Sequence, residues 1–115
     1  MSEFEAAEQI IGKWRSDPDD PEAIATYGDV SLDFTRNGGL VYTIHVEGKR
    51  EIMLLTYRID GDLLITDQPS SPREERTRFK ITCAGKLVLH NERGPSTYVR
   101  IGDVAALPSM NVSTN

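Results

Sequence analysis

From residue 30 onward, the chain is a succession of short β-rich runs separated by turn signals at close intervals. Several of these turns contain glycine, as in Glu47–Gly48 and Asp60–Gly61, and glycine supplies the positive φ that tight hairpins need. Consecutive runs are therefore expected to pair as antiparallel hairpins. The predicted strands are 13–16, 30–36, 40–47, 51–59, 62–66, 76–83, 86–90 and 97–101.

Eight antiparallel strands in simple succession remove their unpaired edges most directly by closing into an up-and-down barrel. We predict a mostly β fold, an eight-stranded antiparallel barrel over 12–101, within one domain covering 1–115. A two-sheet sandwich is the structural alternative. A short amphipathic helix over 3–11 is expected before the barrel, and a polar tail over 102–115 after it.

The segment 17–29 contains two prolines and several acids, which break any periodicity. We interpret it as a solvated acidic loop with room for one turn of helix near 22–26. The acids lack the glycine and the spaced glutamate of a calcium-binding EF-hand loop, so no calcium site is expected.

Composition narrows the possible partners of the chain. Of its 115 residues, 38% are hydrophobic and 27% charged, with a net charge of −5 that opposes binding to nucleic acid or anionic lipid. No apolar stretch approaches the roughly 20 residues needed to span a bilayer, and the first residues lack the pattern of a secretory signal. A lone cysteine, Cys83, cannot form a disulfide within the chain, so we expect a cytoplasmic protein.

Two short motifs stand near the two ends of the predicted barrel. Gly12-Lys13-Trp14 opens the first strand after the helix, and Tyr98-Val99-Arg100 lies in the last strand. This pairing resembles the lipocalin-like, or calycin, barrels. The resemblance implies that Gly12 and Trp14 close the barrel floor and that Arg100 lies over the tryptophan ring, where a guanidinium gains cation–π attraction.

Alternation within the strands assigns one set of side chains to the barrel interior. A set of this size is expected to fill the interior or to leave space for one small ligand. We predict a small, mostly apolar ligand with Tyr42, Tyr57 and Arg78 as its polar contacts, although Arg78 points inward only if its strand slips by one residue. The predicted inner residues are Val30, Leu32, Phe34, Leu40, Tyr42, Ile44, Val46, Thr77, Phe79, Ile81 and Cys83.

The predicted strands 51–59 and 62–66 are apolar on both faces, so both faces require cover. The N-terminal helix is one candidate cover. A second subunit is the other, because a patch formed by Met53, Leu55 and Leu64 is a liability on a monomer. We therefore predict a homodimer through the outer faces of these two strands.

Three functions remain open at this point. The first is a binding module for a small apolar molecule, and the second is a protein-interaction or inhibitor-type module with a filled barrel. The third is an enzyme, for which Tyr57, His45 and Arg78 are the polar candidates, but no base, nucleophile and oxyanion donor are placed together. The two histidines and Cys83 do not form a metal constellation, and no cofactor is expected.

Overall fold

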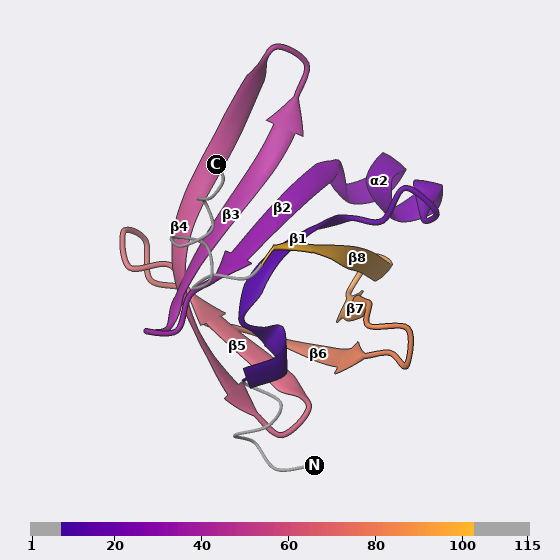
Figure 1. Cartoon of the computed structure of the whole chain (residues 1–115). Coiled ribbons are helices and arrows are strands. Elements are labelled where there is room, and N and C mark those ends of the chain that lie inside the picture. The colour runs from indigo at the N-terminus through magenta and orange to yellow at the C-terminus, as the bar shows by residue number, and fades with distance from the viewer. Residues whose placement is uncertain (1–7, 103–115) are drawn as a thin grey trace, which may run out of the picture.

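The computed structural model describes residues 8–102, which form a closed barrel of antiparallel strands in sequence order (Figure 1). The predicted barrel is confirmed, and the sandwich is excluded because the first strand pairs with both the second and the last. The elements are β1 (Gly12–Ser16), α2 (Pro21–Tyr27), β2 (Asp29–Phe34), β3 (Gly39–Val46), β4 (Lys49–Asp60), β5 (Leu63–Asp67), β6 (Glu75–Ile81), β7 (Leu87–Asn91) and β8 (Gly94–Gly102).

Two helical segments accompany the strands. Residues 8–10 are helical and precede β1, in agreement with the predicted N-terminal helix, whose earlier residues lie outside the described part of the chain. The acidic segment contains the short helix α2, in the place where one turn of helix was expected near 22–26. Pro21 occupies the first helical position and the Asp20 carboxylate accepts a hydrogen bond from the Ala23 amide, so local capping stabilises this short helix.

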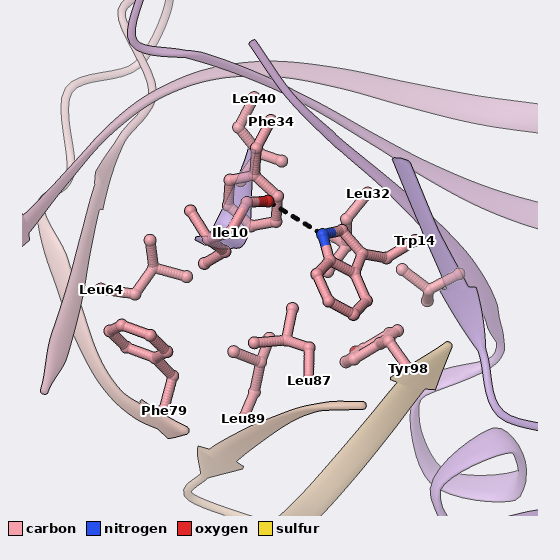
Figure 2. Packing of buried hydrophobic residues seen from close by; sticks show 11 residues of the cluster. Ile10, Trp14, Leu32, Phe34, Leu40, Leu64, Phe79, Leu87, Leu89 and Tyr98 are labelled. Carbon is pink, nitrogen blue, oxygen red and sulfur yellow. Dashed lines mark hydrogen bonds between the residues drawn. The ribbon is translucent and has the colours of Figure 1, made fainter. Parts of the chain in front are cut away.

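Large apolar side chains fill the central part of the barrel interior and the end next to the N-terminal helical segment (Figure 2). Ile10, from that segment, is fully buried among them, so the segment caps this end of the barrel, which we call the closed end. The described cluster consists of Ile10, Trp14, Val30, Leu32, Phe34, Leu40, Leu64, Phe79, Leu87, Leu89 and Tyr98.

Two residues of the predicted inner set lie elsewhere. Val46 is 44% exposed because the β3–β4 hairpin extends beyond the neighbouring strands, as Figure 1 shows. Cys83 is exposed because β6 ends at Ile81, where a turn begins with the Thr82 amide donating to the Lys86 carbonyl. The predicted strand to residue 83 was wrong at this end, since the glycine turn begins earlier than the apolar pattern indicates.

The pairing register also corrects the patch expected on the outer faces of β4 and β5. Leu55 pairs with Leu40, and Leu64 pairs with Ile59, so both leucines share the inner face with core residues. Met53 pairs with Tyr42 and shares its face. The predicted outer patch of Met53, Leu55 and Leu64 was therefore wrong, because apolar residues on both faces of a strand conceal which face is buried.

One apolar residue of β5 is buried on the outer side of the sheet. Ile65 is only 2% exposed and stands between Arg58 of β4 and Arg76 of β6. Both arginines form ion pairs with Glu74, at 3.8 and 2.8 Å. The aliphatic stems of the two arginines flank Ile65, while their charged ends remain at the surface.

A buried carboxylate ties the end of β1 to the turn before β7. Asp17 is 4% exposed, and its carboxylate accepts hydrogen bonds from Lys86 Nζ at 2.7 Å and from the Asp19 amide at 2.9 Å. The Lys86 ammonium holds the pKa of Asp17 below its ordinary value, and the Asp17 carboxylate raises the pKa of Lys86.

This pair is expected to make stability depend on pH in acid. Because the pKa of Asp17 is lowered in the folded state, its stabilisation is present above its unfolded pKa and is lost as pH falls through the folded pKa. Asp17→Asn should therefore flatten the acid side of a plot of melting temperature against pH. Glu92→Gln, at an exposed turn position, is the control. Equal acid slopes for Asp17→Asn and the wild type would contradict this assignment.

Candidate functional site

The contact between Trp14 and Arg100 that the resemblance implied is present at the closed end of the barrel. The Arg100 guanidinium carbon lies 4.3 Å from the centroid of the Trp14 ring, and Trp14 is fully buried. Arg100 Nη1 also donates to the Ile11 carbonyl at 2.8 Å, while the Trp14 indole donates to the Ile10 carbonyl at 2.9 Å. The two side chains thus hold the helical segment against the barrel.

Gly12 permits the close approach of Arg100. Its φ is +130°, and a Cβ added there would lie 2.5 Å from Arg100 Nη1 and 2.9 Å from the Gly102 carbonyl oxygen. A side chain at this position would therefore collide with the floor. Gly12, Trp14 and Arg100 are brought together as a structural group.

Tyr57 also belongs to the closed end. Its hydroxyl donates to the Thr35 carbonyl at 2.7 Å, and its ring meets Phe34 edge to face with centroids 5.0 Å apart. Burial raises the pKa of Tyr57, so it remains a neutral donor at physiological pH. Tyr42 stands opposite Met53, and Tyr57 lies four positions further along β4, so about 13 Å of strand lies between Met53 and Tyr57. The structure does not bring Tyr42 and Tyr57 together.

Arg78 lies on the outer face of β6, which is the register that alternation favours. It stands opposite Leu63 and His90, and its Nε is 3.1 Å from an Asp62 carboxylate oxygen. Since its side chain is 68% exposed, Arg78 is not an interior residue. The inward-pointing arginine that a slipped register would give is therefore absent at this position.

The interior near α2, which we call the α2 end, carries a hydrogen-bonded line of polar side chains. Asn91 Nδ2 donates to Ser96 Oγ at 2.8 Å, and Ser96 Oγ donates to Tyr98 Oη at 3.0 Å. Ser96 and Tyr98 are 2% and 3% exposed. Tyr98 packs among the apolar core residues in Figure 2, so this line reaches from the barrel rim into the core.

The first member of this line is a fixed donor. Asn91 Nδ2 also donates to the Leu89 and Gly94 carbonyls, which only accept, so this atom must be the amide nitrogen. Ser96 Oγ therefore accepts from Asn91, and its own proton goes to Tyr98 Oη. With Ser96 Oγ as the donor to Tyr98 Oη, the Tyr98 proton is the terminal donor of the line.

The electrostatic environment keeps this donor protonated. Burial raises the pKa of Tyr98 to about 12, and Tyr42 and Tyr27 act in the same direction. Tyr42 is half-buried, and burial raises its pKa as well. Tyr27, at the end of α2, donates its hydroxyl to the Gly94 carbonyl at 2.7 Å. Neutral phenols thus gather at the α2 end.

The sequence pointed to Tyr42 as a polar contact of the ligand but not to Asn91 or Ser96. The Gly94-Pro95 pair indicated a turn, and the last strand was therefore expected to begin at residue 97. In the structure, β8 begins at Gly94, and Pro95 is paired with His90. If the strand is extended back from Tyr98, alternation places Ser96 on the same inner face, and this is the signal that could have identified it.

Metal-binding clusters and membrane-spanning helices are both absent from residues 8–102. This part of the chain holds no group of three or more His, Cys, Asp or Glu side chains suited to a metal ion. Within the same residues, no helix has the length and apolar character needed to cross a membrane. In comparisons of the whole chain with known proteins, no family model, curated protein or solved structure matches it.

Proposed function

We propose that this protein is a small lipocalin-like barrel that binds a small, mostly apolar molecule at the α2 end of its interior. The observation that carries the proposal is the line of donors from Asn91 through Ser96 to Tyr98. A buried hydroxyl whose proton has no acceptor is costly, and a bound oxygen atom would remove that cost. Within residues 8–102, Tyr98 Oη accepts its hydrogen bond from Ser96 Oγ, which leaves the Tyr98 proton without an acceptor there.

The surrounding side chains indicate the chemistry of the ligand. Tyr42 and Ile44 pack against the core but remain partly exposed, so they offer apolar contact at its margin. The donors are neutral, and burying a carboxylate without a positive partner is costly. A carbonyl, ether or hydroxyl oxygen on an apolar body fits these groups better than a fatty acid.

The size of the ligand is limited by the filled closed end. Phe34 and Leu87 are fully buried, and Leu89 is 7% exposed. A long acyl chain would have to displace these residues. We therefore propose a compact ligand that occupies only the α2 end.

Tyr98→Phe is expected to weaken binding of a carbonyl-bearing apolar probe by about 3–10-fold, because one hydrogen bond to the ligand is lost. A naphthyl ketone dye, whose emission responds to its environment, supplies both the carbonyl and the signal. Tyr57→Phe is the matched control, since it removes a phenol hydroxyl at the closed end. Its affinity for the dye should equal that of the wild type.

Native mass spectrometry of the purified protein provides the complementary measurement, a retained molecule of low mass. If the wild type neither retains a small molecule nor binds the dye, the ligand proposal fails. The interaction module with a filled barrel would then be favoured. Equal losses of affinity in Tyr98→Phe and Tyr57→Phe would refute the assignment of the site to the α2 end.

A further inference from the structure

A carboxylate, Glu75, lies on the inner face of the barrel wall at the start of β6. Alternation along β6 places Glu75, Thr77 and Phe79 on one face of the strand, and Phe79 belongs to the buried core. The pairing register agrees, because Glu75 stands opposite Thr66, which in turn stands opposite Tyr57 of the inner face. Glu75 is therefore an interior residue at the margin of the barrel.

Glu75 faces Tyr42 across the interior. Burial raises the pKa of Tyr42, and Tyr27 and the Glu75 charge act in the same direction. A carboxylate raises the pKa of a phenol in this way only when the two groups are close. In the closed sheet, β4 and β5 separate β3, which carries Tyr42, from β6. The short path between the two side chains thus runs through the interior, and Glu75 lies at the α2 end.

Three tyrosines converge on the same end of the interior. Tyr27, Tyr42 and Tyr98 come from α2, β3 and β8. Burial raises the pKa of Tyr98, and Tyr42 and Tyr27 add to this rise, which places the three phenols near one another. The face of a tyrosine ring attracts a cation that lies within about 6 Å of its centre. Aromatic rings beside a carboxylate are the surroundings that favour a positive charge.

Arg73 is the ion-pair partner of Glu75 within residues 8–102, but the pair is exposed. Arg73 Nε lies 3.4 Å from Glu75 Oε2, and the two side chains are 80% and 58% exposed. Exposed ion pairs contribute little to stability, because solvent screens the charges and ordering two long side chains costs entropy. A ligand cation whose apolar body is held in the interior can therefore take the place of the Arg73 guanidinium.

We propose that the ligand of the α2 end carries a positive charge, an ammonium group that lies between Glu75 and the Tyr42 ring while an oxygen of the same molecule accepts from Tyr98. This inference rests on the proposed function and adds the charge of the ligand to it. The buried Tyr98 proton, which lacks an acceptor within residues 8–102, marks the inner end of the site independently of Glu75.

The exposures of the two polar groups set the orientation of this ligand. Tyr98 is 3% exposed and the Glu75 side chain 58%, so the oxygen lies deep and the ammonium group stays at the mouth. An ammonium group at the mouth keeps part of its hydration, which limits the cost of burying a charge. The net charge of −5 also attracts cations to the protein.

Two naphthyl ketone dyes of equal shape test the charge of the ligand. One carries a trimethylammonium group and the other a neutral tert-butyl group at the same position, so the dyes differ in charge and hardly in size. The wild type should bind the cationic dye about 3–10-fold more tightly than the neutral dye. This preference should fall as salt is added, because the charges at the mouth are exposed. Fluorescence titration measures both dissociation constants.

Three variants assign the preference to Glu75. Glu75→Gln should bring the two dissociation constants close to each other and leave the affinity for the neutral dye unchanged. Glu74→Gln is the matched control, because it makes the same charge change at the neighbouring residue, which pairs with Arg58 and Arg76 on the outer surface. It should keep the preference of the wild type. Arg73→Gln should increase the preference, because it removes the competing cation.

The outcomes separate this inference from the proposed function. If the wild type binds both dyes equally well, the inference fails and the proposed function stands. If it binds neither dye, the proposed function fails and the inference fails with it. Equal losses of preference in Glu75→Gln and Glu74→Gln would indicate a general effect of net charge and would overturn the assignment to Glu75.

Discussion

Trp14→Ala is expected to destabilise the fold by about 3–5 kcal/mol, the range for removing a large aromatic side chain from a packed core. The indole is fully buried, and its loss leaves the Ile10 carbonyl without its donor and Arg100 without the ring beneath it. Such a loss is a large fraction of the stability of a typical small domain, about 5–15 kcal/mol. Chemical denaturation followed by circular dichroism measures the change.

Comparing Trp14→Ala with Arg100→Ala separates the stability that the indole ring contributes from the stability that the covering guanidinium contributes. Arg100→Ala keeps the indole but removes the cation and the donor to the Ile11 carbonyl, so the fold should lose less stability than in Trp14→Ala. Its tryptophan emission should shift to longer wavelength as water reaches the ring. An unchanged emission spectrum and melting temperature in Arg100→Ala would contradict the role assigned to this pair.

Gly12→Ala is the other substitution with a large expected effect, a loss of about 1–3 kcal/mol from backbone strain alone. The φ of +130° is one that residues with a side chain rarely adopt, and the new Cβ meets Arg100 Nη1 and the Gly102 carbonyl oxygen. The guanidinium is able to move, but the carbonyl belongs to the backbone of β8. Urea unfolding of the single variant gives the size of the loss.

A double-mutant cycle with Arg100→Ala separates the two causes of the stability loss in Gly12→Ala, backbone strain and the contact with Arg100. In the double variant, the contact with Nη1 disappears, whereas the strained φ and the contact with Gly102 remain. The two substitutions should therefore be less than additive, because the residues touch. Strict additivity would show that Gly12 and Arg100 act independently, against the close approach described for the floor.

The barrel was predictable because turns and alternation carry the information that closure needs. Hairpin turns such as Glu47–Gly48 fix the order of the strands, and alternation in 30–34 marks one buried face. The strands β4 and β5 lack this signal, since Leu54–Leu55 and Leu64–Ile65 place an apolar residue on each face. Only the pairing with β3 and the charged cover over Ile65 decide which side is inside.

The candidate site was predictable only in part, for a related reason. Tyr42 shares a face with apolar neighbours and was selected by alternation. Nothing local distinguishes it from Tyr57, whose hydroxyl donates to the Thr35 carbonyl in the turn between β2 and β3. The polar line at the α2 end depends on Asn91 and Ser96 meeting across the β7–β8 hairpin. That meeting requires β8 to continue back to Gly94, and Pro95 hides this extension in the sequence.

The floor of the barrel is assembled from the two ends of the described chain. It therefore cannot form until the last strand has been synthesised. The bond from Arg100 to the Ile11 carbonyl joins positions 89 residues apart. During translation, β1 leaves the ribosome long before β8. In the nascent chain, Trp14 is therefore present before Arg100 can cover its ring, and the barrel stays open at the position of β8. Contacts of such high sequence separation form slowly. The nascent barrel is therefore open to chaperones and to misassociation until its final strand emerges.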